Sequence, residues 1–278
     1  MDRAVDSPEA GLKALMAWWR EAGVDSAEAA AILEAPTPRA AAGAGEAPSQ
    51  AAPAKAPLRP RAAKPPQRSA ADDARAAAAA ADSLPALRAA LEAFDGCALK
   101  QTARQTVFCD GVEGAPVMVV GEAPGREEDA AGKPFVGRSG QLLDRMLGAI
   151  GLSRETNVFI SNVIFWRPPG NRPPTQGEIA ACLPFIERAV ALARPRLLLL
   201  SGGFAAQTLL KRDDGVMRLR GKRLTCPLPP LTDPLHAMVM LHPAYLLRRP
   251  QDKRLAWTDL LACAAWADEL GIDRPGSA

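Results

Sequence analysis

The sequence predicts an α/β fold, a three-layer αβα sandwich around a central four-stranded, mainly parallel sheet. Short apolar segments have the length of buried strands, at residues 116–120, 157–165, 196–200 and 237–241. Helical patterns separate or follow them, at residues 140–150, 176–193, 204–211 and 254–270. Strands that alternate with helices need crossover connections, which make the strands parallel and place helices on both faces of the sheet.

The chain divides into three parts. Residues 1–35 have apolar side chains at helical spacing and are expected to form a small N-terminal helical segment, too short to fold well alone. Residues 36–81 are rich in Ala and Pro and are expected to be a disordered linker. Its Ala-rich end, from residue 72 to 82, is expected to form a helix that leads into the core. Residues 82–272 contain the strand and helix patterns and form the main domain.

Composition limits the possible functions without choosing one. The net charge of +3 over 278 residues permits nucleic-acid binding but does not argue for it. The chain has no run of about 18 apolar residues, so no membrane partner is expected. The N-terminus lacks the pattern of a signal peptide, and the five scattered cysteines do not form a secreted disulfide framework. These features predict a cytoplasmic location.

Polar residues and glycines follow the four predicted strands. Gly121, Asn162, Gly202 and His242 fall at or just beyond the strand ends. In open parallel sheets the ligand lies at the carboxyl ends of the strands. Four loops therefore converge on one edge of the sheet, where we expect the functional site.

The loop after the first predicted strand reads GEAPGREEDAAGKPFVGRSG. Gly121 and Gly125 allow a sharp turn after the strand. The loop lacks the Lys-Ser/Thr ending of a phosphate-binding loop and the spacing of a dinucleotide fold. Its acids Glu122, Glu128 and Asp129 would repel phosphate, whereas clustered carboxylates suit water activation or stabilisation of a cation.

Three motifs together carry a family resemblance. GEAPG with EDAAGKPFVGRSGQLLDRML, then NVIFWRPPGNRPPT, then HPAYLLR resemble, in this order, the uracil-DNA glycosylases of the type 4, iron–sulfur branch. The resemblance covers most of residues 94–262. It implies the uracil-DNA glycosylase fold, with residues 82–272 as the catalytic domain. It also implies a monomeric base-excision enzyme that hydrolyses uracil from single- or double-stranded DNA and leaves an abasic site.

The resemblance assigns three residues to uracil binding. The base must leave the helix and enter a pocket before it is cleaved. Phe135 is the aromatic ring on which uracil stacks, and Gly121 lines the same pocket. The amide of Asn162 pairs with N3–H and O4 of uracil, which the donor pattern of cytosine does not match.

Four further residues carry the chemistry that the resemblance implies. Glu128 matches the acid that activates water, and Glu122 and Asp129 flank it. Cleavage passes through an oxocarbenium-like sugar, which a carboxylate stabilises. His242 stabilises negative charge at O2 of the departing uracil, as a neutral imidazole that donates one hydrogen bond.

The segment after His242 is expected to contact DNA. It is a stiff turn with bulky apolar residues and a terminal cation, which suits a wedge in the base stack. Tyr245 or Leu247 is the inserted residue, and Arg248 binds phosphate. The expected DNA-binding residues are Asn171, Arg172, Tyr245, Leu246, Leu247 and Arg248.

The sequence departs from the family at the metal ligands. The resemblance implies a cluster with four cysteine ligands, and Cys97 and Cys182 match two of those positions. Phe94 and Trp166 occupy the other two. A [4Fe–4S] cluster normally needs four thiolates, so no metal cofactor is expected. The alternative is a cluster completed by another cysteine such as Cys109.

Two other functions stay open at this point. The first is a glycosylase that acts on other deaminated bases, hypoxanthine or xanthine. The second is a non-catalytic protein that binds uracil-containing or abasic DNA through the same pocket. The complete set of Glu128, Asn162 and His242 argues against a protein without activity.

Overall fold

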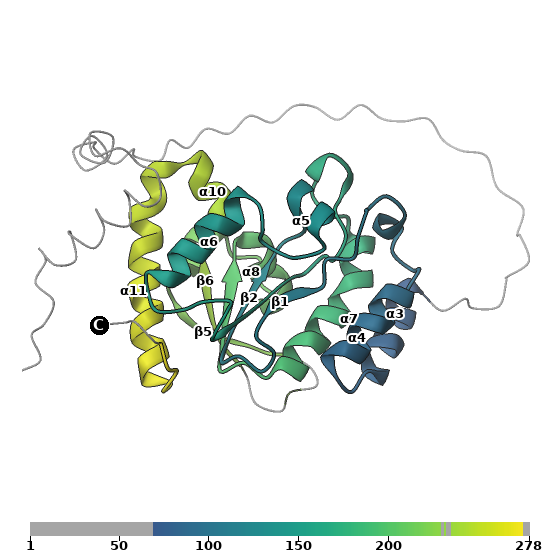
Figure 1. Cartoon of the computed structure of the whole chain (residues 1–278), viewed down its shortest axis with the longest axis horizontal. Helices are drawn as coiled ribbons and strands as arrows, with labels where there is room; N and C mark the ends of the chain where they lie inside the picture. The colour runs from purple at the N-terminus through teal and green to yellow at the C-terminus, as the bar shows by residue number, and fades with distance from the viewer. Residues whose placement is uncertain (1–68, 229–230, 232–234, 275–278) are drawn as a thin grey trace, which may run out of the picture.

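The computed structural model describes residues 69–228, 231 and 235–274. The predicted N-terminal helical segment and the linker up to residue 68 lie outside these residues. A six-stranded sheet with the order β1-β3-β2-β4-β6-β5 forms the centre (Figure 1). Its strands are β1 (Cys109–Gly111), β2 (Val117–Gly121), β3 (Val158–Asn162), β4 (Leu197–Ser201), β5 (Arg223–Cys226) and β6 (Leu235–Met240).

Helices surround the sheet. The α-helices are α3 (Ala70–Ala80), α4 (Leu84–Ala93), α5 (Arg126–Ala131), α6 (Arg138–Gly148), α7 (Gln176–Ala193), α8 (Gly203–Leu210), α9 (Val216–Leu219), α10 (Pro243–Arg248) and α11 (Lys253–Glu269). Short 3-10 helices are η1 (Ala98–Gln101), η2 (Pro169–Asn171) and η3 (Pro250–Asp252). Among the described residues, no helix is long and apolar enough to cross a membrane.

The four predicted strands form the parallel centre of the sheet. Strands β3, β2, β4 and β6 are neighbours and run parallel, with Gly121 paired to Asn162 at their carboxyl ends. The prediction of a parallel four-stranded centre is confirmed. It missed the antiparallel edge strands β1 and β5, because β1 has three residues and β5 exposes two of its four, so neither has a long apolar pattern.

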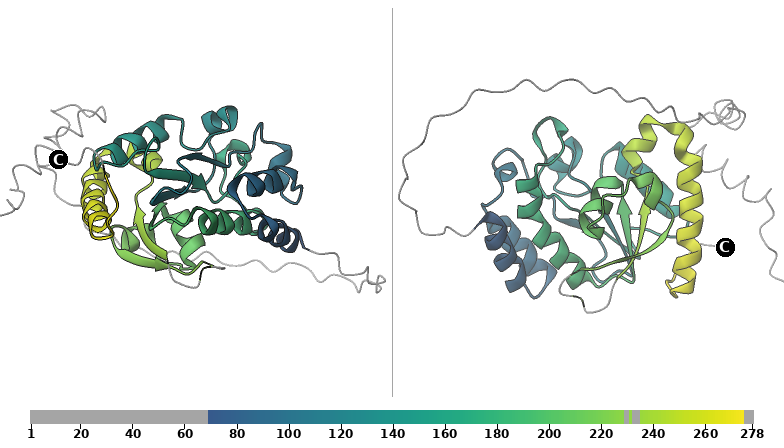
Figure 2. Two further views of the ribbon diagram at one scale, coloured as in Figure 1. Left: turned by 60° about the horizontal axis from the view of Figure 1, so that its bottom comes forward. Right: turned by 180° about the vertical axis from the view of Figure 1, so that it is seen from behind.

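Helices cover both faces of the sheet, as the predicted αβα sandwich requires (Figure 2). Successive side chains of a strand point to opposite faces. Val117 and Val119 of β2 therefore pack in the cluster that includes α6, α10 and α11. Met118 and Val120 pack in the cluster that includes α3, α4, α7 and α8.

Helix α3 corrects the boundary of the predicted linker. The Ala-rich helix is present, but residues 70–81 belong to the folded domain and are not disordered linker. Ala74 and Ala78 are buried and lie in the same core cluster as the buried residues of α7. Arg188 of α7 donates two hydrogen bonds to the carbonyl oxygen of Ala81, at 2.9 and 2.6 Å. The small alanine side chains let α3 and α7 approach closely. The linker was predicted from its lack of large apolar residues, and that criterion does not detect a helix that packs through alanine.

Candidate active site

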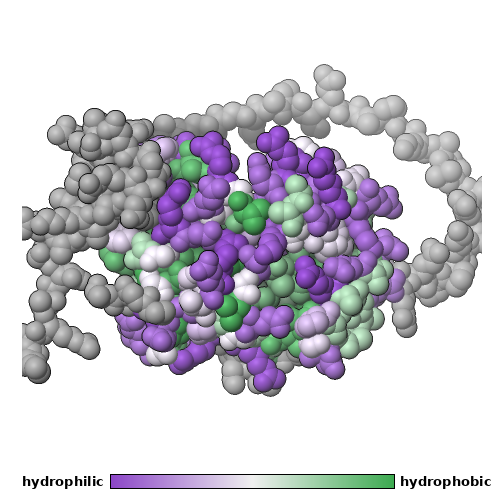
Figure 3. Space-filling model, viewed as in Figure 1, coloured by the Kyte–Doolittle hydropathy of each residue, from purple (hydrophilic) through white to green (hydrophobic). Residues whose placement is uncertain are grey.

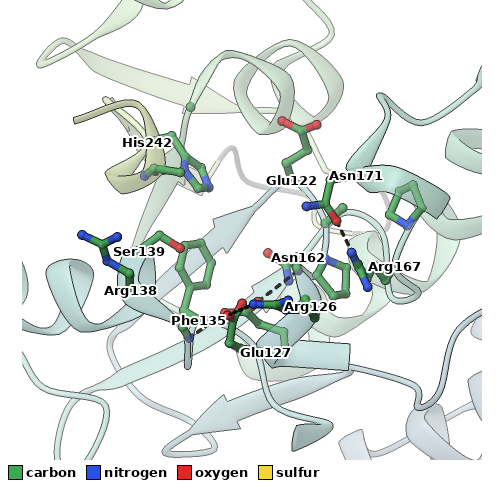
Figure 4. A pocket seen from close by; sticks show the side chains of 18 of the residues that line it. Glu122, Arg126, Glu127, Phe135, Arg138, Ser139, Asn162, Arg167, Asn171 and His242 are labelled. Carbon is green, nitrogen blue, oxygen red and sulfur yellow. Dashed lines mark hydrogen bonds and ion pairs between the residues drawn. The ribbon is translucent and has the colours of Figure 1, made fainter. Parts of the chain in front are cut away.

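A pocket of about 820 Å³ opens at the carboxyl edge of the parallel strands. Helices α5, α6 and α10 begin at this edge, and polar residues predominate on the surface around them (Figure 3). Nine of the predicted catalytic, uracil-binding and DNA-binding residues line the pocket: Glu122, Glu128, Phe135, Asn162, Asn171, Arg172, His242, Leu247 and Arg248. The structure therefore brings residues from three distant segments into one site (Figure 4).

Gly121 was predicted to line the pocket but does not; it lies where the side chains of Phe135 and Asn162 meet, and we call the space bordered by these two side chains the slot. A Cβ atom on Gly121 would lie 2.5 Å from Oδ1 of Asn162 and 2.5 Å from Cζ of Phe135. The loops after β2 and β3 are joined because the N–H of Val163 donates to the carbonyl of Gly121 at 3.0 Å. The missing side chain at residue 121 thus lets an aromatic ring and an amide approach the same point.

Phe135 has an unusual backbone conformation. Its φ angle is 53°, in the left-handed region that non-glycine residues rarely adopt. Its ring and the imidazole of His242 are 5.6 Å apart between centroids, with an angle of 30° between their planes. The pocket therefore has two nearly parallel rings on one side, one of them able to donate a hydrogen bond.

The imidazole of His242 is oriented by the start of α10. Nδ1 accepts a hydrogen bond from the backbone N–H of Ala244 at 3.1 Å. Burial, with Arg248 nearby, lowers the pKa of His242 to about 4. The ring is therefore neutral near pH 7, and because Nδ1 accepts, Nε2 carries the proton.

The carboxylate of Glu128 is engaged by backbone N–H groups. Oε2 accepts from Gly125 at 3.0 Å, and Oε1 accepts from Val136 at 3.0 Å and Gly137 at 2.9 Å. These bonds tie the two ends of the loop around α5 together. Both oxygens of Glu128 thus already have partners.

Glu122 has a different environment. Its carboxylate lines the same pocket and makes no hydrogen bond or ion pair with the described residues. Burial raises the pKa of Glu122. Asp129 does not line the pocket, and its carboxylate accepts from the N–H of Arg104 at 2.8 Å. The expectation that Asp129 belongs to the catalytic group is corrected accordingly.

Helix α10 divides the expected DNA-binding residues. Leu247 and Arg248 line the pocket. Leu246 is fully buried in the core cluster of α6 and α11, so the expectation that it contacts DNA is wrong. The hydroxyl of Tyr245 donates to Asp252 at 2.6 Å, which holds this ring along η3. Leu247 is thus the bulky apolar residue of this helix that lines the pocket, beside the small Ala244.

The opposite wall contains Asn171 and Arg172. Oδ1 of Asn171 accepts from Nε of Arg167 at 2.8 Å. Arg172 donates two hydrogen bonds to Glu178, at 2.9 and 2.6 Å, and the pKa of Glu178 falls to about 2 because of them. The guanidinium of Arg172 is therefore already bound to the carboxylate of Glu178 in the first turn of α7.

Three arginines around the pocket were not predicted from the sequence. Arg126, Arg138 and Arg167 line it together with Arg248. They lie on α5, at the start of α6 and before η2, so no single motif groups them. The cations surround a group of carboxylates, and this combination suits a polyanion held at the rim with chemistry on a developing cation inside.

The positions expected for metal ligands fit an apolar core better than a cluster. The ring of Phe94 packs on Phe185, 5.3 Å between centroids. Trp166 is buried, and its Nε1–H donates to Thr106 at 3.0 Å. The buried thiols of Cys97 and Cys182 are neighbours, and their interaction lowers the pKa of Cys97 and raises that of Cys182.

Two thiols are half of the donor set that a [4Fe–4S] cluster normally needs. Within the described part of the chain, no group of three or more His, Cys, Asp or Glu side chains is placed to hold a metal ion. The side chains of Phe94 and Trp166 belong to the buried core cluster that also contains Cys97 and Cys182. The residues present therefore do not fit the cluster implied by the resemblance.

Comparisons with known proteins agree with the motifs. The family model described as the uracil DNA glycosylase superfamily matches residues 108–261. A type-4 uracil-DNA glycosylase of Archaeoglobus fulgidus is 40% identical over 159 residues, 56% of this chain and 78% of the relative. Those of Pyrobaculum aerophilum and Thermotoga maritima are 36% and 35% identical, over 80% and 77% of their own lengths.

Proposed function

The chain belongs to the uracil-DNA glycosylase superfamily, in its type 4 branch, and from this membership and the geometry of the pocket we propose that it excises uracil from DNA. The substrate is a DNA strand whose uracil has been flipped out of the stack. The products are free uracil and an abasic site. The observation that carries the proposal is the meeting of Glu122, Asn162 and His242 in one pocket.

Recognition of uracil depends on the slot bordered by Phe135 and Asn162. The base stacks on Phe135, and the amide of Asn162 accepts from N3–H and donates to O4. Cytosine presents an acceptor and a donor at these positions and is rejected, because buried polar groups would stay unpaired.

The chemistry is hydrolysis of the bond between C1′ and N1. As this bond lengthens, the sugar becomes oxocarbenium-like and uracil gains negative charge. The Nε2–H of neutral His242 donates to O2 and stabilises the uracil anion. A carboxylate orients water toward C1′ and accepts its proton, and the oxygen of that water becomes the hydroxyl on C1′.

We assign the water to Glu122 in preference to Glu128. A base needs a free lone pair directed at the water. The oxygens of Glu128 accept three backbone N–H groups, whereas the carboxylate of Glu122 has no partner among the described residues. Glu128 then shapes the loop that presents Phe135.

DNA binding is supported by the rim of the pocket. Arg126, Arg138, Arg167 and Arg248 surround the opening and can bind phosphates on either side of the flipped nucleotide. Leu247 is the wedge that fills the gap in the base stack. Arg172 supports the wall through Glu178.

The proposed enzyme works without an iron–sulfur cluster. Packing of Phe94 on Phe185 and the hydrogen bond of Trp166 stabilise the region that a cluster occupies in the family. No catalytic step requires the metal, because its place lies among buried core residues that do not line the pocket.

A nicking assay tests the activity. Single- and double-stranded oligonucleotides carrying uracil, hypoxanthine or xanthine are incubated with the full chain and then treated with alkali. Cleavage at uracil, lost in Glu122→Gln and His242→Asn, is the expected result. Binding of uracil-containing DNA without cleavage of any base would support a binding protein. Cleavage at hypoxanthine or xanthine but not at uracil would show that the chain is a glycosylase for other deaminated bases.

A further inference from the structure

Arg154 lies behind the pocket, in the loop between α6 and β3, and the proposed mechanism does not use it. Its side chain is mostly buried, 16% exposed. It donates to Asp110 at 2.8 Å, to Asp144 at 2.9 Å and to the carbonyl oxygen of Phe135 at 2.8 Å. It also donates to the carbonyl oxygen of Pro134 at 3.2 Å. One guanidinium thus joins β1, α6 and the backbone that carries the stacking ring.

The backbone that Arg154 holds is the strained one. Phe135 has φ of 53°, a conformation that persists where surrounding structure fixes it. Its carbonyl is also pressed against α6, since a Cβ atom on Gly140 would overlap it at 1.9 Å. Gly140 permits the close approach, and the guanidinium of Arg154 donates to the carbonyl oxygens of Pro134 and Phe135 beside it.

Two carboxylates hold the guanidinium in place. Asp110 also pairs with Lys133 at 3.3 Å. Burial alone would raise the pKa of Asp110, but its hydrogen bonds to Arg154 and Lys133 lower it. The planar fork of arginine can serve a carboxylate and two carbonyls at once, which a lysine ammonium cannot do in the same geometry.

We propose that Arg154 is a positioning residue for base recognition, which fixes the ring of Phe135 against the uracil slot. This inference rests on the proposed function, because the ring matters through the base that stacks on it. Arg154 does not line the pocket and acts through the carbonyls of Pro134 and Phe135.

A double-mutant cycle tests the proposal in the full chain. Arg154→Gln should weaken inhibition by free uracil and lower kcat/KM by about 10- to 100-fold, since small misplacements of a positioning group have effects of this size. In a Phe135→Ala background the same substitution should have no further effect on uracil affinity. Equal effects of Arg154→Gln in both backgrounds would overturn the proposal.

Control variants separate positioning from general stability. Arg154→Lys keeps the charge but not the fork, so it should not restore uracil affinity. Arg223→Gln breaks an exposed bidentate pair with Glu269, at 2.5 and 2.6 Å, on the edge strand β5, where Arg223 does not line the pocket. It should leave uracil affinity unchanged. If Arg154→Gln lowers only Tm and leaves uracil affinity of the folded protein intact, Arg154 is structural.

A readout independent of activity distinguishes this inference from the proposed function. The chain is labelled with fluorophenylalanine, and the resonance of Phe135 is assigned by its loss in Phe135→Leu. In Arg154→Gln this resonance should shift or broaden while the other six keep their positions. An unchanged Phe135 resonance would overturn the positioning role, whether or not the wild-type chain releases uracil.

Discussion

His242 and Ala244 are joined by a hydrogen bond in which the backbone N–H of Ala244 donates to Nδ1 over 3.1 Å. This bond fixes the proton of the neutral ring on Nε2, which is the atom left to face the pocket. With a pKa lowered to about 4, the ring is a neutral donor over the pH range in which carboxylates are ionised. The uracil anion then receives a hydrogen bond without proton transfer.

Replacing His242 by Gln should change how stability depends on pH. The folded-state pKa of about 4 lies below the unfolded value of about 6.5, so the unfolded chain binds more protons between them. Wild-type stability is therefore lost as pH falls through this window. Urea denaturation should show a larger decrease in the free energy of unfolding from pH 7 to pH 4.5 for wild type than for His242→Gln. Equal decreases would contradict a buried neutral imidazole.

Glu122→Gln and Glu128→Gln should differ in kind. Glu122→Gln removes a carboxylate without protein partners, so kcat should fall at least about 100-fold, as expected for a general base, with little change in Tm. Glu128→Gln turns an amide nitrogen toward backbone donors and should destabilise the fold by about 1–3 kcal/mol. Single-turnover kinetics and thermal unfolding of both variants check this. A larger kinetic loss for Glu128→Gln at unchanged Tm would reverse the assignment.

The parallel centre of the fold could be predicted because its strands are continuously apolar. Segments such as residues 196–200 are too short for helices and too apolar for loops, so their length and composition were enough to predict buried strands. Helix α7 was predicted with its observed bounds, and the structure adds a capping box of Thr175 and Glu178 at its start. Strand β1 has three residues and helix α10 six, too few for a periodic signal.

The site was predicted less evenly, for physical reasons. Motifs identified most of the residues that line the pocket, but they did not show which of their polar atoms already have hydrogen-bond partners within the protein. The three backbone donors to Glu128 come from residues up to nine positions away, and their convergence depends on the loop conformation. The burial of Leu246 depends on how α10 packs on α6. Arg154 belongs to no motif, so its link to Phe135 was visible only in three dimensions.

Gly121→Ala should close the uracil slot. The added methyl would lie 2.5 Å from both Phe135 and Asn162, closer than carbon and oxygen atoms pack in proteins. We expect kcat/KM for uracil-containing DNA to fall at least about 10-fold, with affinity for undamaged DNA unchanged, because rim arginines are unaffected. Gly177→Ala is a matched control, since a Cβ there meets no atom within 4 Å. Full activity of Gly121→Ala would show that the base does not stack in this slot.

Leu247→Ala should impair double-stranded substrates more than single-stranded ones. A wedge stabilises the gap left by a flipped base, and a single strand has no paired stack to refill. The ratio of kcat/KM for the two substrates is the measurement. Tyr245→Phe is the control, because it removes the hydrogen bond to Asp252 and leaves Leu247 in place. A similar loss on both substrates in Leu247→Ala would assign the residue to general binding.

The apolar filling around Cys97 and Cys182 predicts a protein whose stability does not depend on iron. Chain purified without oxygen should contain no stoichiometric iron or sulfide, and a chelator should leave its Tm unchanged. Trp166→Ala, in contrast, should destabilise the fold by about 3–5 kcal/mol, the usual cost of deleting a buried large aromatic side chain. Cysteines at both positions, in Phe94→Cys/Trp166→Cys, recreate the four-thiolate donor set of the family. Iron uptake by this variant and not by wild type would show that hydrophobic packing has replaced the metal, whereas stoichiometric iron in wild type would contradict it.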